Sequence, residues 1–552
     1  MWRRGSFILV IVLCAASGLR AFSTWGHTLS IEVQLQKAGF QKYVDEVPRL
    51  TSIKVPLSAR PHTPFDLDIH LRQMKVKIHR DLPEALAWGY EGLTPGPMIE
   101  VQSGQALRVH WKNDLPLQHI LPAATGMDMS TTVPLPDVRT VTHLHGASVE
   151  QASQTDSVHN NDGWPDAFTV PGQEQISLYP NQVSARTLFF HDHAIGTTGR
   201  NVAAGLMGLY LIHDDYERSL NLPSGPYEIT LALQAKGLNA DGSMYYVADL
   251  NNEHYGNVVA VNGKIWPYMN VEPRKYRLRL VNISNARSYD MKFVDVGDQS
   301  AGPAIAQIGS DGGFLDKIAE PDLLRLAPAE RADIIVDFSK YAGHDFFLYN
   351  TNHDAADGEL PIPELMKFKV AAVVSSPDTS SLPLRLKPIP RIDPRTAVIS
   401  RQIVLSSPDI GGGRQISLLN GKLWHDPITE RAQLGTVEIW KLMNTTSDTH
   451  PFHVHLVEFQ VLDRTPFDAA EYLKSGNFVV TGPAVPPDDN ETGWKDVIRT
   501  PPSVVTRIIM KFNTYAGFYV YHCHILEHED MDMMRPFEVY RPVAPAALPV
   551  VE

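Results

Sequence analysis

The sequence is poor in cysteine, in long hydrophobic runs and in positive charge. Of its 552 residues only two are cysteines, Cys14 and Cys523, so a disulfide framework is excluded as the basis of the fold. The apolar run from Phe7 to Ala16 is too short to cross a bilayer, and no later segment is longer and equally apolar, so we expect no membrane span. The formal net charge of −13, without a basic run, argues against nucleic acid as a partner.

Residues 1–21 have the pattern of an export signal. Arg3 and Arg4 form a basic start, the apolar run follows, and Ala21 offers a small residue at a cleavage point. We therefore expect an exported protein, whether periplasmic, extracellular or secretory; a buried N-terminal strand is the alternative. Removal of this signal would leave Cys523 as a lone thiol, and metal ligation would explain it.

Composition and repeats indicate an all-β fold. The chain is 43% hydrophobic and holds 41 Pro and 37 Gly, which suits many strands joined by turns. One pattern occurs three times, at Pro95–Asn113, Trp266–Asn282 and Ala432–Asn444. It consists of an apolar strand, a turn and an alternating strand that ends on Asn. Two copies follow an Asn-Gly-Lys step, at 262–264 and 420–422, which predicts a tight hairpin. The repeat predicts three similar β domains.

The predicted organisation follows from these signals. It comprises the signal (1–21), an N-terminal segment (22–63) with a short helical pattern over 28–46, β domains over 64–216, 217–374 and 398–545, a Pro-rich linker over 375–397, and a tail over 546–552.

The stretch from Tyr521 to Met534 carries the strongest chemical signal. On a β-strand, His522 and His524 face one way and Cys523 the other. A Cys thiolate with a His and a Met at intervals of five residues suits a trigonal copper site with a weak axial thioether. The stretch therefore predicts a bridge between two copper sites. The alternative is a buried cysteine flanked by core histidines.

Three more His-X-His pairs extend this pattern. Each pair places both rings on one face of an extended segment, so all four pairs together supply eight imidazoles to a shared metal cluster. The three pairs are His143/His145, His191/His193 and His453/His455. The first two lie in the first predicted domain and the others in the third, so we expect the cluster between these domains, with the middle domain as spacer. The residues left for the lone copper are His450, Cys523, His528 and Met533.

The chain resembles the multicopper oxidases in four motifs. They are HLHG (143–146), HDH (191–193), HPFHVH (450–455) and HCHILEHEDMDMM (522–534). The segments at 179–193, 261–282 and 326–338 look like the bacterial spore-coat laccase and bilirubin oxidase branch. The resemblance implies cupredoxin-like domains, which are Greek-key β-sandwiches or barrels, and four copper ions: one type 1, one type 2 and two type 3. It also implies a laccase-like activity, in which a small phenolic or aromatic reductant, or a tetrapyrrole such as bilirubin, gives single electrons and dioxygen is reduced to water.

The resemblance also assigns roles. It gives His143 and His453 to the type 2 copper, and it leaves Met531 and Met534 as alternatives to Met533 at type 1. The edge of His528 or of His450 is the expected entry point for electrons, and in the family the more exposed of the two ligands corresponds to His528. The type 3 ligands would be His145, His191, His193, His455, His522 and His524.

Two acids match the family's proton-handling residues. They are Asp162 and Glu529, and a positioned carboxylate can relay the protons that oxygen reduction consumes. The alternatives are a turn residue before Gly163 for Asp162 and a solvated acid for Glu529. Asp192 is a further candidate, for orienting metal-bound imidazoles.

One loop departs from the family pattern, and two rival functions remain open. The loop over 147–161 is longer than expected for the branch and carries an extra His159, which suits a solvated insertion, or alternatively a lid or a supplementary ligand. A ferroxidase or other metal-ion oxidase would need carboxylates at the mouth of the type 1 site. A copper-binding relative without catalysis is the rival from another class, although such proteins usually show gaps in the ligand set.

Overall fold

The computed structural model describes residues 31–37, 39–57, 63–123, 134–247, 252–352 and 361–542. The predicted export signal over 1–21 and the predicted tail over 546–552 lie outside these residues. Strands account for 43% of the described residues and helices for 8%, which confirms the all-β prediction. Within the described part, no helix has the length and apolar character needed to span a bilayer.

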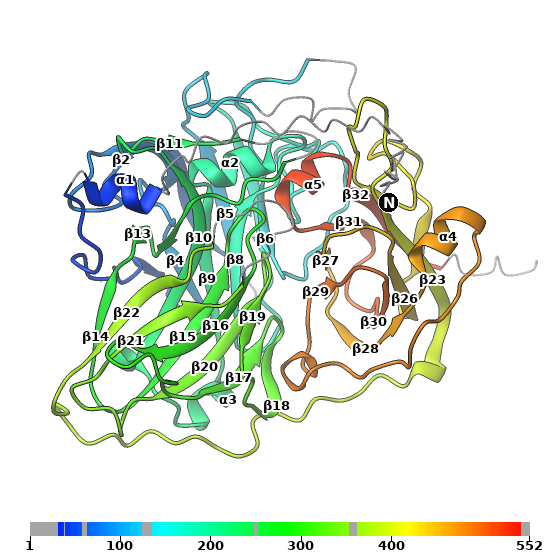
Figure 1. Ribbon diagram of the computed structural model, residues 1–552. Coiled ribbons are helices and arrows are strands. Elements are labelled where there is room, and N and C mark those ends of the chain that lie inside the picture. The colour runs from blue at the N-terminus through cyan, green and yellow to red at the C-terminus, as the bar shows by residue number, and fades with distance from the viewer. Residues whose placement is uncertain are drawn as a thin grey trace, which may run out of the picture.

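The described residues form three two-sheet β-sandwiches, coloured in Figure 1 from blue and cyan through green to yellow and red. The first sandwich packs a sheet of order β1 (Ser52–Lys54), β4 (Met98–Gln102), β9 (Met207–His213), β8 (Arg186–Asp192) and β6 (Thr142–His145). Its second sheet has the order β3 (Ala85–Tyr90), β2 (Phe65–Val76), β5 (Leu107–Asn113) and β7 (Glu174–Tyr179). Buried aromatic side chains, among them Trp88 and Phe190, fill the space between the sheets.

The middle sandwich, green in Figure 1, is built in the same way. One sheet has the order β13 (Lys264–Ile265), β12 (Val258–Val261), β10 (Glu228–Leu238), β15 (Lys275–Asn282), β20 (Arg331–Asp337), β17 (Ile305–Ser310) and β18 (Gly313–Ala319), with β11 (Met244–Tyr245) beside β10. The other has the order β14 (Tyr268–Val271), β22 (Glu364–Val370), β21 (Asp345–Asn350), β16 (Tyr289–Asp295) and β19 (Leu324–Leu326).

The third sandwich lies at the right of Figure 1 and carries the C-terminal metal-ligand motif. One sheet has the order β24 (Leu418–Leu419), β23 (Ala397–Ser406), β26 (Val437–Asn444), β30 (Val504–Lys511) and β28 (Phe459–Pro466). The other has the order β25 (Glu430–Gln433), β32 (Met534–Tyr540), β31 (Gly517–Cys523), β27 (His450–Val454) and β29 (Val497–Thr500). Cys523 and Met533 are part of the apolar core of this sandwich.

The predicted repeat is confirmed in all three sandwiches. Each copy forms a short strand, a turn and a longer strand that ends on Asn: β4 and β5, β14 and β15, and β25 and β26. The Asn-Gly hairpins are confirmed too. Val261 pairs with Lys264, and Asn262 and Gly263 have φ of 50° and 83°, as a tight turn with two left-handed residues requires.

Helices are short, and two of them, α2 and α5, are buried. The α-helices are α1 (Ile31–Lys37), α2 (Thr198–Ala204), α3 (Asp215–Ser219), α4 (Ala469–Ser475) and α5 (Leu526–Asp530), and the 3₁₀ turns are η1 (Gly225–Tyr227), η3 (Pro394–Thr396) and η4 (Asp489–Glu491). α2 follows His193 and α5 follows His524. The carboxylate of Asp530 accepts hydrogen bonds from the backbone N–H groups of Thr198 and Gly199, each at 2.9 Å, and thereby joins the first sandwich to the third.

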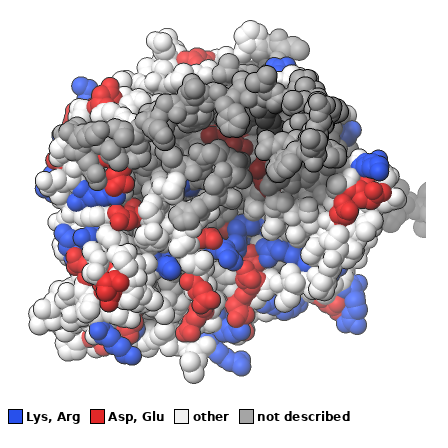
Figure 2. Space-filling model, in the orientation of Figure 1, with Lys and Arg blue, Asp and Glu red and all other residues white. Residues whose placement is uncertain are grey.

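The segment over 371–393 joins the middle and third sandwiches and carries no helix or strand. On the face shown in Figure 2, acidic and basic side chains are interspersed over the part of the surface that is drawn in colour.

Candidate metal centre

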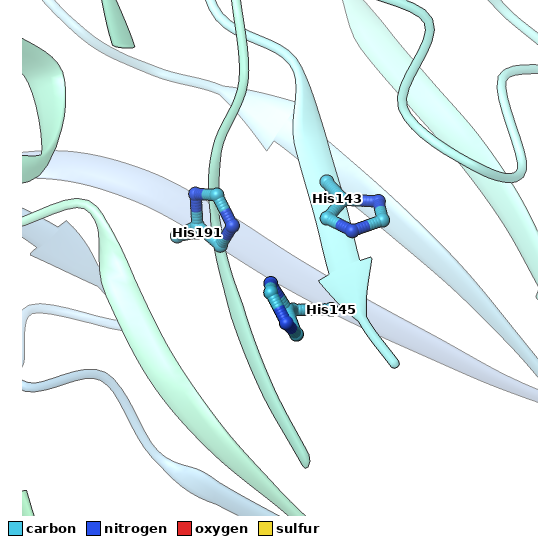
Figure 3. Close-up of side chains that lie close together, drawn as sticks. All are labelled: His143, His145 and His191. Carbon is cyan, nitrogen blue, oxygen red and sulfur yellow. The ribbon is translucent and has the colours of Figure 1, made fainter. Parts of the chain in front are cut away.

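Strand pairing brings the His-X-His pairs together. In the first sandwich β6 and β8 are antiparallel, with His143 opposite His191. In the third, β27 and β31 are antiparallel, with His453 opposite His522. Figure 3 shows the rings of His143, His145 and His191 gathered between two adjacent strands. Because side chains two apart on a strand share a face, each paired strand presents its histidines toward the other sandwich.

The two sandwiches meet at these faces. Nε2 of His522 lies 3.4 Å from Nε2 of His193 and 3.2 Å from Nε2 of His455, so rings from the first and third sandwiches are in contact. These three residues form one donor group, with ligand atoms within 4.8 Å of one another. Two further groups with the same spacing are His143/His145/His191 and His143/His453/His455. The ring of His524 lies 5.0 Å from that of His145 and 5.2 Å from that of His191. All eight predicted imidazoles therefore lie in one cluster.

Backbone carbonyls fix the orientation of half of these rings. A carbonyl oxygen only accepts, so the Nδ1 atom that faces it carries the proton and Nε2 is left as a lone-pair donor. His191 donates in this way to Asp192 at 2.8 Å, and His453 donates to Asp496 at 2.7 Å. His522 does the same to Cys523 at 2.9 Å, and His143 to Asp162.

Several ring nitrogens of the cluster have no partner within the described chain. Nε2 of His143, His191 and His453 and Nδ1 of His145 are fully buried without a hydrogen bond, as are both ring nitrogens of His524. Burial also lowers the pKa of these rings, to about 4 for His191 and about 3 for His453, so they are neutral at physiological pH. Buried polar atoms are normally paired, and neutral imidazoles are common ligands of copper. The donor set therefore fits a cluster of copper ions.

A second donor set lies on the other face of β31. Sγ of Cys523 is 3.4 Å from Nδ1 of His450 and 3.7 Å from Nδ1 of His528, and the three residues form a buried donor group. The N–H of Ile525 donates to the same sulfur at 3.4 Å. One thiolate with two imidazoles is the ligand set of a trigonal copper site.

Of the three methionines near this second set, Met533 shares its apolar core. Its side chain is fully buried in the same core as Cys523, and its carbonyl accepts a hydrogen bond from the Cys523 N–H at 3.0 Å. Met531 packs instead with the core of the first sandwich, and Met534 packs with Trp164 and Trp424. The packing therefore favours Met533 over its two neighbours as the thioether that faces the sulfur.

Both predicted acids lie against the histidine cluster. Oδ2 of Asp162 is 2.9 Å from Nδ1 of His455, and burial raises the pKa of this carboxyl well above its usual value. Oε2 of Glu529 is 3.1 Å from Nδ1 of His522, and Oε1 is 3.5 Å from Nδ1 of His193. Glu529 is fully buried, unlike a solvated acid. Asp192 accepts hydrogen bonds from Val141, Ala194 and Asn201 instead, so its carboxylate holds the strand ends around the neighbouring rings.

The insertion over 147–161 packs against the cluster at its base and is exposed at its tip. Gln151 is buried, and its side-chain oxygen accepts from the N–H of Asp162 at 2.8 Å. The His159 side chain is 69% exposed and bonds to Asp156, and it belongs to none of the donor groups in the described part of the chain. The environment of His159 therefore fits the interpretation of this loop as a solvated insertion.

Three residues at the site were not predicted from the sequence. Glu253, from the middle sandwich, places Oε1 2.7 Å from Nε2 of His528. Asp496 lies 3.2 Å from His145, and Arg331 pairs with Asp496. Their roles come from contacts between residues far apart in the sequence, which no local spacing encodes.

A cavity of about 280 Å³ lies beside the cluster. The lining includes His143, His453 and His455, together with Arg186 and Glu458. The three histidines are themselves buried, so the cavity lies beside the cluster and their rings stay shielded from bulk solvent.

Comparison with known proteins agrees with this geometry. Two family models described as multicopper oxidase match residues 135–217 and 400–543. A laccase of Bacillus subtilis (strain 168) is 40% identical over 527 residues, covering 91% of this chain and 99% of the relative. The chain belongs to the multicopper oxidase family.

Further relatives agree with this assignment. A bilirubin oxidase of Albifimbria verrucaria is 32% identical and covers 89% of this chain and 78% of the relative. The crystal structure of a laccase from Pediococcus acidilactici Pa5930 superposes with a TM-score of 0.69 at 28% identity, covering 91% of this chain and 96% of that one. The three sandwiches are thus cupredoxin-like domains, as predicted. This multicopper oxidase is a copper-dependent oxidoreductase that uses dioxygen as its electron acceptor.

Proposed function

We propose that this multicopper oxidase acts as a laccase, oxidising small phenolic or aromatic reductants, including tetrapyrroles of the bilirubin type, by single electrons. The observation that supports the proposal is the arrangement at the end of one strand: Cys523 belongs to one donor set, while His522 and His524 lie in the histidine cluster. In this proposal His450, Cys523, His528 and Met533 hold the type 1 copper. His143 and His453 hold the type 2 copper. The type 3 pair is held by His145, His191, His193, His455, His522 and His524.

Bound copper would supply one-electron acceptance at the first set and four-electron reduction of dioxygen to two waters at the second. The chain contributes the connection between them, because the peptide bonds from His522 to His524 join the two donor sets directly. Burial of Cys523 raises the pKa of its thiol, so the apoprotein holds a protonated, water-shielded sulfur until a metal replaces the proton.

The carboxyls handle protons in this proposal. Asp162 and Glu529 both contact imidazoles of the cluster, at 2.9 Å and 3.1 Å, and both are buried. The hydroxyl of Thr198 donates to Glu529 at 3.1 Å and holds its orientation. Water in the cavity beside His143 and His455 would exchange with solvent and supply or remove protons.

The test is steady-state oxidation of a phenol, bilirubin and ferrous iron in parallel by copper-loaded protein, with oxygen uptake and copper content measured. We expect four copper ions per chain, a blue absorption from sulfur-to-copper charge transfer, and the highest kcat/KM with a phenol or bilirubin. Loaded protein without oxygen uptake would contradict the proposal and favour the copper-binding alternative.

One contact favours a second candidate, metal-ion oxidation. A carboxylate at the mouth of the first donor set is what a ferrous ion requires, and Glu253 lies 2.7 Å from His528. The comparison of Glu253→Gln with the wild type separates the two candidates. A fall of about tenfold or more in ferrous oxidation, with phenol oxidation preserved, would support the metal-ion substrate. Equal effects on both reductants would assign Glu253 to positioning His528. Glu174→Gln, a partly exposed acid on β7, serves as the control.

We also propose that the chain is exported. Support comes from Arg3, Arg4, the apolar run and Ala21. N-terminal sequencing of the protein purified from its producing cells tests this, and an intact Met1 start would contradict it.

A further inference from the structure

One buried arginine of the middle domain contacts all three domains. Arg331, at the start of β20, has a side chain that is 1% exposed. Nε donates to the carbonyl of Thr187 in the first domain at 3.2 Å. Nη1 donates to the carbonyl of Ala329 at 3.0 Å, and Nη2 to that of Asp311 at 3.2 Å. The two remaining N–H groups go to the carboxylate of Asp496 in the third domain, one of them at 2.6 Å. All five donors of the guanidinium are therefore used.

Asp496 in turn contacts two cluster histidines from different domains. Oδ1 of its carboxylate is 3.2 Å from Nε2 of His145, and its backbone carbonyl is 2.7 Å from Nδ1 of His453. The two rings are stacked, with centroids 3.8 Å apart. One residue thus orients a ring from the first domain and a ring from the third.

These contacts select a different tautomer for each ring. The carboxylate of Asp496, which also accepts hydrogen bonds from Arg331, accepts one from the N–H at Nε2 of His145. The His145 ring therefore presents Nδ1 inward. The carbonyl takes the N–H at Nδ1 of His453, so that ring presents Nε2 inward. The two nitrogens left over, Nδ1 of His145 and Nε2 of His453, are both buried without a partner in the described chain.

The middle domain, which contains Arg331, also holds the backbone on the N-terminal side of Asp496. The N–H of Gly312 donates to the carbonyl of Trp494 at 2.9 Å. Nζ of Lys495 is 2.9 Å from Asp311 and 3.1 Å from Glu330. The space around the carboxylate is also closed, because a Cβ added at Gly146 would lie 2.6 Å from Oδ2 of Asp496.

We propose that Arg331 and Asp496 are positioning residues for oxygen reduction, through which the middle domain sets the tautomer and orientation of His145 and His453. The inference rests on the copper cluster proposed above. It gives the middle domain a role in assembling that cluster, although the domain supplies none of the proposed ligands.

The test compares Arg331→Lys and Asp496→Asn with the wild type and with Arg277→Lys. Arg277 is a matched control because its guanidinium is also buried and forms a bidentate pair, with Asp333, but does not reach the cluster. The measurements are copper bound per chain, the blue absorption of the Cys523 set, the paramagnetic resonance signal of the type 2 copper, oxygen kinetics, and the unfolding midpoint of the copper-free protein.

For Arg331→Lys and Asp496→Asn we expect the blue absorption per chain to be retained, copper at the cluster to fall below the wild-type content, and oxygen reduction to slow by about 10- to 100-fold. Arg277→Lys should lower the unfolding midpoint while copper content and oxygen kinetics stay at wild-type values.

Full copper content with wild-type oxygen kinetics in Arg331→Lys or Asp496→Asn would overturn the inference. So would an equal loss of cluster copper in Arg277→Lys, because the effect would then be one of general stability. If Arg331→Lys does not fold, the comparison of Asp496→Asn with the wild type and with Arg277→Lys tests the inference by itself. A wild-type protein that binds no copper at the cluster would instead refute the proposed function.

Discussion

The carboxylate of Asp162 and the ring of His455 meet across the interface of the first and third domains, with Oδ2 2.9 Å from Nδ1. The other carboxylate oxygen of Asp162 is buried without a hydrogen bond in the described chain. The backbone of Asp162 is held by Gln151, whose loop packs on β31 through the hydrogen bond from the N–H of Phe518 to the Gln151 carbonyl at 2.9 Å. Gln151 of the insertion over 147–161 thus contacts both the backbone of Asp162 and β31.

Asp162→Asn removes the titratable group but keeps the shape of the side chain. We expect kcat to fall by about 100-fold or more, because proton transfer by a positioned group typically contributes that much. Copper content and the blue absorption should be unchanged. Asp166→Asn is the control, since Asp166 lies in the same loop and accepts from Trp424 at 2.9 Å. Loss of copper in Asp162→Asn would assign the residue to holding His455 instead.

Glu529→Gln probes proton transfer from the other side of the cluster. The amide can still accept from Thr198 but cannot carry a proton, so we expect kcat to fall by about 10-fold or more and the solvent isotope effect on kcat to rise. Thr198→Val, which removes only the hydroxyl that orients the carboxylate, should give a smaller fall. An unchanged isotope effect in Glu529→Gln would rule out rate-limiting proton transfer through this residue.

Met533→Leu tests the axial position of the type 1 site. A volume-conserving change in this core should cost about 1 kcal/mol of stability or less. Because a thioether stabilises the oxidised copper more than an aliphatic side chain does, we expect the reduction potential of the type 1 site to rise. Redox titration of the blue absorption measures this. Met534→Leu is the matched control, and a potential shift there rather than in Met533→Leu would reassign the axial ligand.

His213 gives the protein a pH-dependent stability remote from the copper sites. Although burial opposes its charge, carboxylates of Glu100 and Glu217 raise its pKa to about 9, with Nδ1 2.7 Å from Glu217. A raised pKa means that the stabilisation is complete below about pH 6.5 and is lost as pH rises through 9; the shift corresponds to about 3 kcal/mol. The unfolding midpoint of the wild type should fall over this range.

His213→Gln should lose that pH dependence. The control is His344→Gln, because His344 pairs with Asp295 at 2.9 Å but its side chain is 56% exposed, where solvent screens the pair. Equal pH profiles for the wild type and His213→Gln would show that other groups determine the alkaline behaviour.

The sequence predicted the parts of the site that depend on local spacing. Alternation along a strand places His522 and His524 opposite Cys523, and the Asn-Gly steps form the tight turns that their φ preferences require. Glu253, Arg331 and Asp496 could not be found in this way. Glu253 meets His528 across 275 positions and Arg331 meets Asp496 across 165, so only the packing of whole domains brings them together.

The contact between His193 and His522 joins positions 329 residues apart. During translation the first domain can fold while the strand that carries His522 is still in the ribosome, since domains generally fold as units in chain order. Half of the imidazoles then have no counterpart, and a nascent protein cannot retain a complete set of metal ions. Copper delivery must follow completion of the polypeptide, and a ribosome that stalls before Gly517 releases a product that metal supplementation cannot activate.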